Sequence, residues 1–128
     1  MDILKIERTP SSPGVVFDAD ELLISIRGIS NPANAANFFR PLVNWLEEFH
    51  SLLQHRTSAP LNIEINLKSI NSESMVMLTD LFKIISKIHR AGMKIIVEWY
   101  YSEDNEAIRE AGQEISDATE LPFIFLEE

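Results

Sequence analysis

A hydroxyl-rich segment, Asn71-Ser72-Glu73-Ser74, has the residue types most suggestive of chemistry in this sequence. It follows a run of alternating apolar and polar residues at 61–68 and precedes a helical pattern, so we expect it at a strand-to-helix junction. Helix capping is the simpler interpretation, because Asn and Ser are favoured N-cap residues. The alternative is a phosphorylation site, where a phosphate would gain unpaired backbone N–H groups and the positive end of the helix dipole.

The densest group of carboxylates lies at positions 103–114 and comprises Glu103, Asp104, Glu106, Glu110 and Glu114. The last three recur every four residues, so they share one face of a predicted helix. A solvated face is the simplest interpretation and a partner-docking face is the next. A divalent-metal site built from the 103–114 carboxylates is a remote alternative, because one straight face supplies few converging oxygen ligands.

Three consecutive aromatic residues, Trp99-Tyr100-Tyr101, end the most apolar run of the chain. Alternate rings of a strand point to opposite faces of its sheet, so core packing explains them. The ends of strands in open α/β sheets are also where ligands bind, which leaves a ligand or partner contact as the alternative.

The elements that must position these residues follow from the periodicity of apolar side chains. We predict strands at 3–6, 15–17, 22–27, 61–68, 95–101 and 121–126, with Gly28 closing the third. We predict helices from Asn34 or Asn37 to about Gln54, from Met75 to Arg90, and from Asp104 or Asn105 past Ile115. Asn34 or Asn37 is the expected N-cap of the first helix, because a proline such as Pro41 is tolerated near the start of a helix and not in its interior.

The order β-β-β-α-β-α-β-α-β predicts an α/β fold with a mixed sheet, an antiparallel hairpin first and parallel β-α units after it. The apolar 95–101 run favours a central strand, and Pro122 predicts an edge strand for 121–126. A chain of 128 residues is typical of one domain, so we expect residues 1–128 to form one.

The formal net charge of −9 comes entirely from residues 98–128, which hold ten acidic side chains and one basic one, Arg109. Such an acidic balance argues against nucleic acid and against anionic membranes as partners. The chain has no cysteine, no apolar run of membrane-spanning length and no secretory signal, so we expect a cytoplasmic protein.

Catalytic and cofactor motifs are missing from the sequence. His50, His55 and His89 lack the spacing of two ligands on one helical face, and no P-loop, GxSxG or GxGxxG occurs. We therefore expect no metal, no cofactor and no enzymatic activity.

Several motifs together resemble the SiaC-type regulatory phosphoproteins, small bacterial proteins with a fold similar to STAS domains of anti-sigma-factor antagonists. The matching positions are Thr9-Pro10, Phe17-Asp18, Ser30-Asn31-Pro32-Ala33-Asn34, Phe38, Pro41-Leu42, Trp45-Leu46, Asn71-Ser72-Glu73-Ser74, Asp80-Leu81, Trp99-Tyr100-Tyr101 and Asp104 to Gln113. The likeness covers nearly the whole chain and keeps the family's order of motifs.

This resemblance implies a phosphorylated residue at the signature Asn-Thr-Ser-Ser of the family, whose threonine position is Ser72 here. It also implies a cognate serine/threonine kinase, a PP2C-type phosphatase and a downstream effector, a diguanylate cyclase in the best-known branch. Three positions depart from the pattern: Glu73 stands for a serine, Asn31 for a tyrosine and Ala33 for a glutamate.

Our first hypothesis is thus a non-enzymatic bacterial signalling protein whose partner binding is switched by phosphorylation of Ser72. The residues expected around the switch and the partner are Ser30, Asn31, Pro32, Asn34, Asn71, Glu73, Ser74, Trp99 and Tyr101. A second hypothesis is a STAS-like interaction scaffold that binds its partner without phosphorylation.

Overall fold

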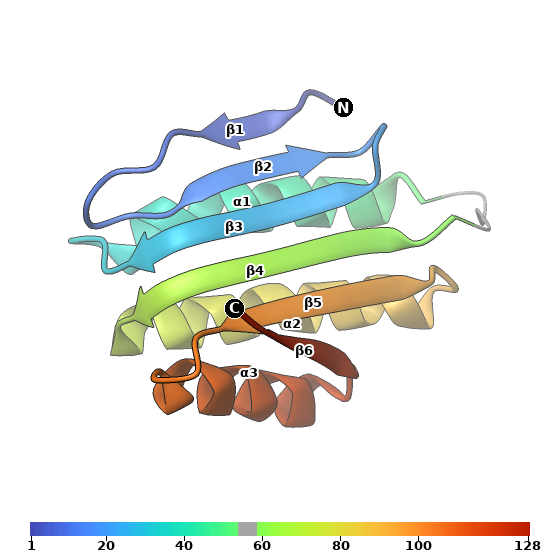
Figure 1. The fold of residues 1–128 in the computed structure, drawn as a ribbon. Helices are drawn as coiled ribbons and strands as arrows, with labels where there is room; N and C mark the ends of the chain where they lie inside the picture. The colour runs from blue at the N-terminus through green and yellow to red at the C-terminus, as the bar shows by residue number, and fades with distance from the viewer. Residues whose placement is uncertain (54–58) are drawn as a thin grey trace.

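Residues 1–53 and 59–128 are described by the structure, a computed structural model. Their strands are β1 (Leu4–Ile6), β2 (Gly14–Asp18), β3 (Leu23–Ser30), β4 (Leu61–Ile70), β5 (Ile95–Tyr101) and β6 (Phe123–Glu127), and their helices are α1 (Ala35–Ser51), α2 (Ser72–Arg90) and α3 (Glu106–Thr119). All six strands join one sheet in the order β1-β2-β3-β4-β5-β6 (Figure 1).

The type of strand pairing changes once across the sheet, at β3. β1, β2 and β3 pair antiparallel, whereas β3, β4, β5 and β6 pair parallel. The four-residue connection between β2 and β3 makes the expected hairpin, and each parallel pair is joined through a helix. The predicted order of elements and the mixed α/β sheet are therefore confirmed.

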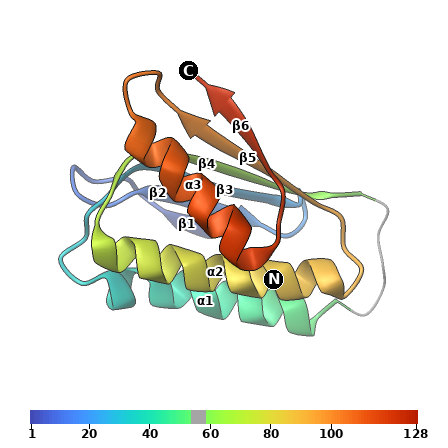
Figure 2. The same ribbon diagram turned by 90° about the horizontal axis from the view of Figure 1, so that it is seen from below.

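The three helices cover one face of this sheet, and the other face is open (Figure 2). The alternation along β4 shows the division: Leu61, Ile63, Ile65 and Leu67 are buried toward the helices, and the residues between them are exposed or half-buried. On the open face, the Arg27 guanidinium lies 3.5 Å from the Glu64 carboxylate on the neighbouring strand. One hydrophobic layer thus holds the fold together.

Helix ends follow the local capping signals. The Asn34 side chain accepts a hydrogen bond from Asn37 N–H at the start of α1, and Gly92, with φ of 111°, follows the end of α2 in a left-handed conformation. Pro41 lies in the second turn of α1, deeper than expected, where it removes the bond to the Asn37 carbonyl. The helix ends at Ser51, and the expected end at Gln54 lies outside the described residues.

One strand prediction needs correction. Gly28 does not close β3: the strand continues to Ser30 through a register shift between Gly28 and Ile29, and Gly28 has φ of 117° there. The extra residue of this bulge is Lys68 on β4, which the register skips between Leu67 and Ser69. β5 is paired with β4 on one side and with β6 on the other, so its predicted place inside the sheet is confirmed. The edge position of β6, directly after Pro122, is confirmed.

The packing of α3 on β5 depends on one small residue. Gly112 faces the ring of Trp99, and a Cβ atom at Gly112 would lie 2.6 Å from the indole Cε2 and Nε1. The Trp99 Nε1 donates a hydrogen bond to the Ile108 carbonyl at 2.9 Å, so helix and ring are tied as well as packed. Ala107 is exposed, because the buried face of α3 runs through Ile108, Gly112 and Ile115.

We predict that Gly112→Ala lowers the free energy of unfolding by about 1–3 kcal/mol, the usual cost of an overpacked core. In an unstrained helix the same change stabilises by about 1 kcal/mol, so the sign alone is diagnostic. Urea unfolding measures it, with the exposed Ala107→Gly as a control expected to cost at most about 1 kcal/mol. A Gly112→Ala protein as stable as the parent would contradict this account of the packing.

Candidate functional site

The candidate site lies where β3 and β4 end side by side. The two strands are parallel and Ser30 pairs with Ile70, so the loop after each strand starts at the same edge of the sheet. The Asn71 N–H donates a hydrogen bond to the Ser30 carbonyl at 2.9 Å. Parallel pairing thus brings the 30–34 loop against the first turn of α2, as the sequence predicts.

Asn71 joins the two loops through both ends of its side-chain amide. Its Oδ1 accepts a hydrogen bond from the Ser74 N–H at 2.8 Å, which caps α2. Its Nδ2 donates to Asn31 Oδ1 at 2.8 Å. The capping interpretation therefore belongs to Asn71, and Ser72 is left with a hydroxyl that no cap requires.

Behind this amide lies a buried pair of hydroxyls. Ser30 Oγ donates to Ser74 Oγ at 2.8 Å, and both residues are fully buried. A buried hydroxyl without a partner is costly, so the pair fixes the loop and the helix relative to each other. We therefore revise the expected place of Ser30 and Ser74 from a partner surface to the support beneath it.

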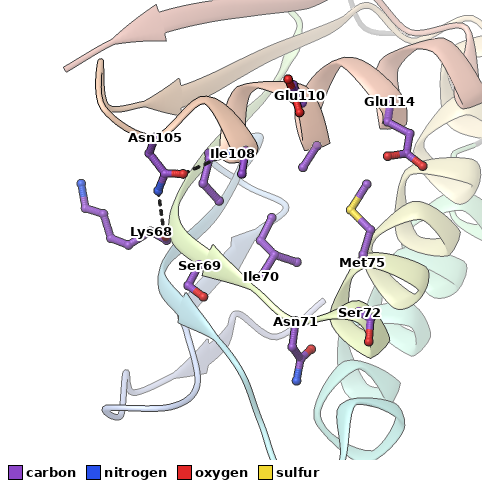
Figure 3. A pocket seen from close by; sticks show the side chains of 12 residues that line it. Lys68, Ser69, Ile70, Asn71, Ser72, Met75, Asn105, Ile108, Glu110 and Glu114 are labelled. Carbon is purple, nitrogen blue, oxygen red and sulfur yellow. Dashed lines mark hydrogen bonds between the residues drawn. The ribbon is translucent and has the colours of Figure 1, made fainter.

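Ser72 itself is exposed and is the first residue of α2. Its side chain is directed away from α3 (Figure 3). The N–H groups of Ser72 and Glu73 belong to the first turn, where no intrahelical acceptor exists. Glu73 is exposed beside it. The side-chain hydroxyl of Ser72 is therefore accessible, and it lies at the positive end of the helix dipole, where anionic groups are favoured.

Other residues of the 30–34 loop surround this turn. Asn31 and Asn34 are exposed and Pro32 is half-buried. Asn31 is held from two sides, since its N–H donates to the Ser11 carbonyl at 2.8 Å while its side chain accepts from Asn71. The loop is therefore an ordered neighbour of Ser72.

The aromatic residues of β5 are not part of this cluster. Trp99 is fully buried under α3, which is the core-packing alternative, so its expected place on a partner surface is corrected. Tyr101 is half-buried and lies 5.9 Å from the guanidinium carbon of Arg109. Tyr100 lies between Trp99 and Tyr101 in the strand. Desolvation by burial and the nearby Glu98 carboxylate raise the pKa of Tyr100. Trp99 and Tyr101 pack with α3 and β6, away from Ser72.

A groove between α2 and α3 opens beside Ser72 and was not anticipated from the sequence. It has a volume of about 490 Å³ and is lined by residues of three elements (Figure 3). Asn105 closes one end, donating from Nδ2 to the Lys68 carbonyl at 3.0 Å. The sequence feature that pointed to this groove is the four-residue spacing of Glu110 and Glu114, because both residues line it.

Among residues 1–53 and 59–128, no group of three or more His, Asp or Glu side chains is arranged to hold a metal ion. The carboxylates of α3 therefore do not converge on one point, and the metal-binding alternative gains no support from their arrangement. In the same residues, no helix is both long and apolar enough to span a membrane.

Comparison with known proteins decides the family. The model of the SiaC family regulatory phosphoproteins matches residues 6–128. The chain belongs to the SiaC family. Its members' description as regulatory phosphoproteins agrees with an exposed hydroxyl at the head of α2.

Relatives of this SiaC-family chain come from Pseudomonas aeruginosa. An uncharacterised protein of strain UCBPP-PA14 is 27% identical over 123 residues, which cover 96% of this chain and 94% of the relative. The crystal structure of apo-SiaC is similar with a TM-score of 0.84 at 25% identity, over 98% of both chains. A crystal structure of the diguanylate cyclase SiaD in complex with its activator SiaC contains a chain similar with a TM-score of 0.86 at 25% identity, over 98% of this chain and 99% of that one.

The capping role of Asn71 gives a prediction for this family member. Asn71→Ala should lower the free energy of unfolding by about 0.5–2 kcal/mol, because the Ser74 N–H loses its acceptor. Asn31→Ala should cost less, because it removes only the link between the loops. Thermal unfolding of the two variants compares them, and equal losses would mean that the cap contributes nothing.

Proposed function

We propose that this protein is a phosphorylation-controlled binding module in which Ser72 is the phosphate acceptor and the state of Ser72 decides whether an effector binds. The single observation that carries the proposal is the exposed Ser72 hydroxyl on the first turn of α2, beside a cap already supplied by Asn71. Ser74, the neighbouring serine of the motif, is fully buried, which leaves Ser72 as the hydroxyl of this motif that a kinase could reach.

A phosphate on Ser72 would bring a charge of about −1.5 to −2 to a surface that already carries Glu73. The positive end of the helix dipole, carried by the unpaired amides of the first turn, would stabilise an anionic charge there by about 0.3–1 kcal/mol. The fold need not change, because the Asn71 and Ser74 contacts lie beneath the acceptor. The switch we propose is therefore a change of surface charge on an ordered scaffold.

The partners we propose are a serine/threonine kinase, a PP2C-type phosphatase and a diguanylate cyclase as effector, all in a bacterial cytoplasm. The resemblance of the motifs to the family supports the kinase and phosphatase. The complex of a related SiaC with the diguanylate cyclase SiaD supports the effector, and through it a part in cyclic di-GMP signalling and biofilm regulation. The protein has no catalytic step of its own in this scheme.

We expect the protein to gain one phosphate when it is incubated with ATP and an extract of its source cell. Intact-mass spectrometry should show the gain in the parent and in Ser69→Ala, and no gain in Ser72→Ala. Ser69 is a suitable control because it is exposed and lies three residues before Ser72. Absence of a mass shift in the parent, or its persistence in Ser72→Ala, would contradict the proposal.

The scaffold alternative makes a different prediction about binding. If phosphorylation is the switch, Ser72→Ala and Ser72→Asp should differ in their affinity for the source cell's diguanylate cyclase by about tenfold, the effect of roughly 1.4 kcal/mol. Biolayer interferometry with the purified cyclase measures both. Equal affinities of the two variants would favour a constitutive scaffold.

A further inference from the structure

The groove between α2 and α3 has an apolar floor and an acidic wall. Its floor includes Ile70, Met75 and Ala111, all half-buried, and its wall on α3 carries Glu110 and Glu114, which are exposed. Glu114 points from α3 toward α2 across the groove (Figure 3). A surface of this kind fits an occupant that has both apolar atoms and positive charge.

The carboxylates of this wall are not neutralised by the protein itself. In the described part of the chain, neither Glu110 nor Glu114 forms an ion pair. Arg109, on the same helix, is turned to the sheet, with its guanidinium carbon 4.7 Å from the centre of the Phe125 ring. Lys68, at one end of the groove, lies 3.5 Å from the Glu128 carboxylate. The negative charge of the wall is therefore available to an occupant.

We infer that this groove is the docking site for a segment of the effector that presents Arg or Lys next to a large apolar side chain. The inference rests on the proposed function and names the chemistry of its binding partner. The apolar side chain would cover Met75 and Ala111, and the cation would reach Glu110 and Glu114. A long basic side chain suits both parts, since its methylene stem packs on apolar surface while its charged end reaches the wall.

The docking groove and the switch are adjacent but separate. Ser72 lines the groove at the first turn of α2, and its hydroxyl is directed away from α3 (Figure 3). Glu110 and Glu114 thus select the partner by charge, whereas the phosphate acts at the rim. Complementary charges of this kind determine specificity and association rate more than total affinity.

The test uses a short blocked peptide of leucine and arginine residues at helical spacing, titrated into the protein and followed by amide NMR shifts. The parent should bind it, with the largest shifts at Ile70, Met75 and Ala111. The double variant Glu110→Gln/Glu114→Gln should bind about fivefold more weakly, as expected for losing two exposed ion pairs. This variant keeps its fold, because removing a like-charge pair four residues apart slightly stabilises a helix.

The matched control is Glu47→Gln/Glu48→Gln, which removes the same charge from an exposed part of α1. It should bind the peptide as the parent does, and a peptide with glutamate in place of arginine should bind neither. No binding of the arginine peptide, shifts spread over the acidic surface, or equal weakening in both double variants would overturn the inference. Phosphorylation of Ser72 is scored separately by intact mass, so a failed groove and a failed switch give different results.

Discussion

The parallel alignment of β3 with β4 is the constraint on which the site depends. Ser30 and Ile70 are paired, and the register shift after Gly28 brings the two strand ends level. Without this alignment the loop after β3 would not meet the start of α2, and Asn71 would cap its helix without contacting Asn31. A long-range backbone pairing therefore determines which residues surround Ser72, and the sequence near Ser72 does not determine this alone.

The residues around Ser72 form a buried layer and an exposed layer. The lower layer is buried and made of the Ser30–Ser74 hydroxyl pair, which has its hydrogen-bonding needs met internally. The upper layer is exposed and consists of Ser72 and Glu73. The cap of α2 is supplied by Asn71 and not by either of their side chains. The buried hydroxyls are hydrogen-bonded to each other, so a charge added to the exposed layer changes the surface without breaking a buried hydrogen bond.

The sequence predicted what local rules control. The hairpin and the Asn34 and Asn105 caps each depend on residues within a few positions of one another, and all are present. The meeting of the 30–34 loop with the 71–74 turn was also predictable, because parallel strands end at one edge.

The depth of side chains was not predictable in the same way. Which residues of a strand end face the helices depends on which side of the sheet the helices cover. The sequence therefore left both core packing and a partner contact open for Trp99, and the structure shows that it is buried. Gly28 closes a strand by propensity, yet the pairing with β4 carries the strand past it. The groove depends on the spacing between two helices in the folded protein, and sequence periodicity holds no information on that spacing.

The contact between Gly112 and Trp99 gives the protein an internal optical reporter. The chain has two tryptophans, and they report on different regions: the Trp45 Nε1 donates to the Asp2 carbonyl near the N-terminus, whereas Trp99 is enclosed beneath α3. Indole fluorescence responds to the polarity and packing around the ring. A displacement of α3 would therefore alter the emission of Trp99 and leave that of Trp45 unchanged, so events on the acidic helix can be followed without a label.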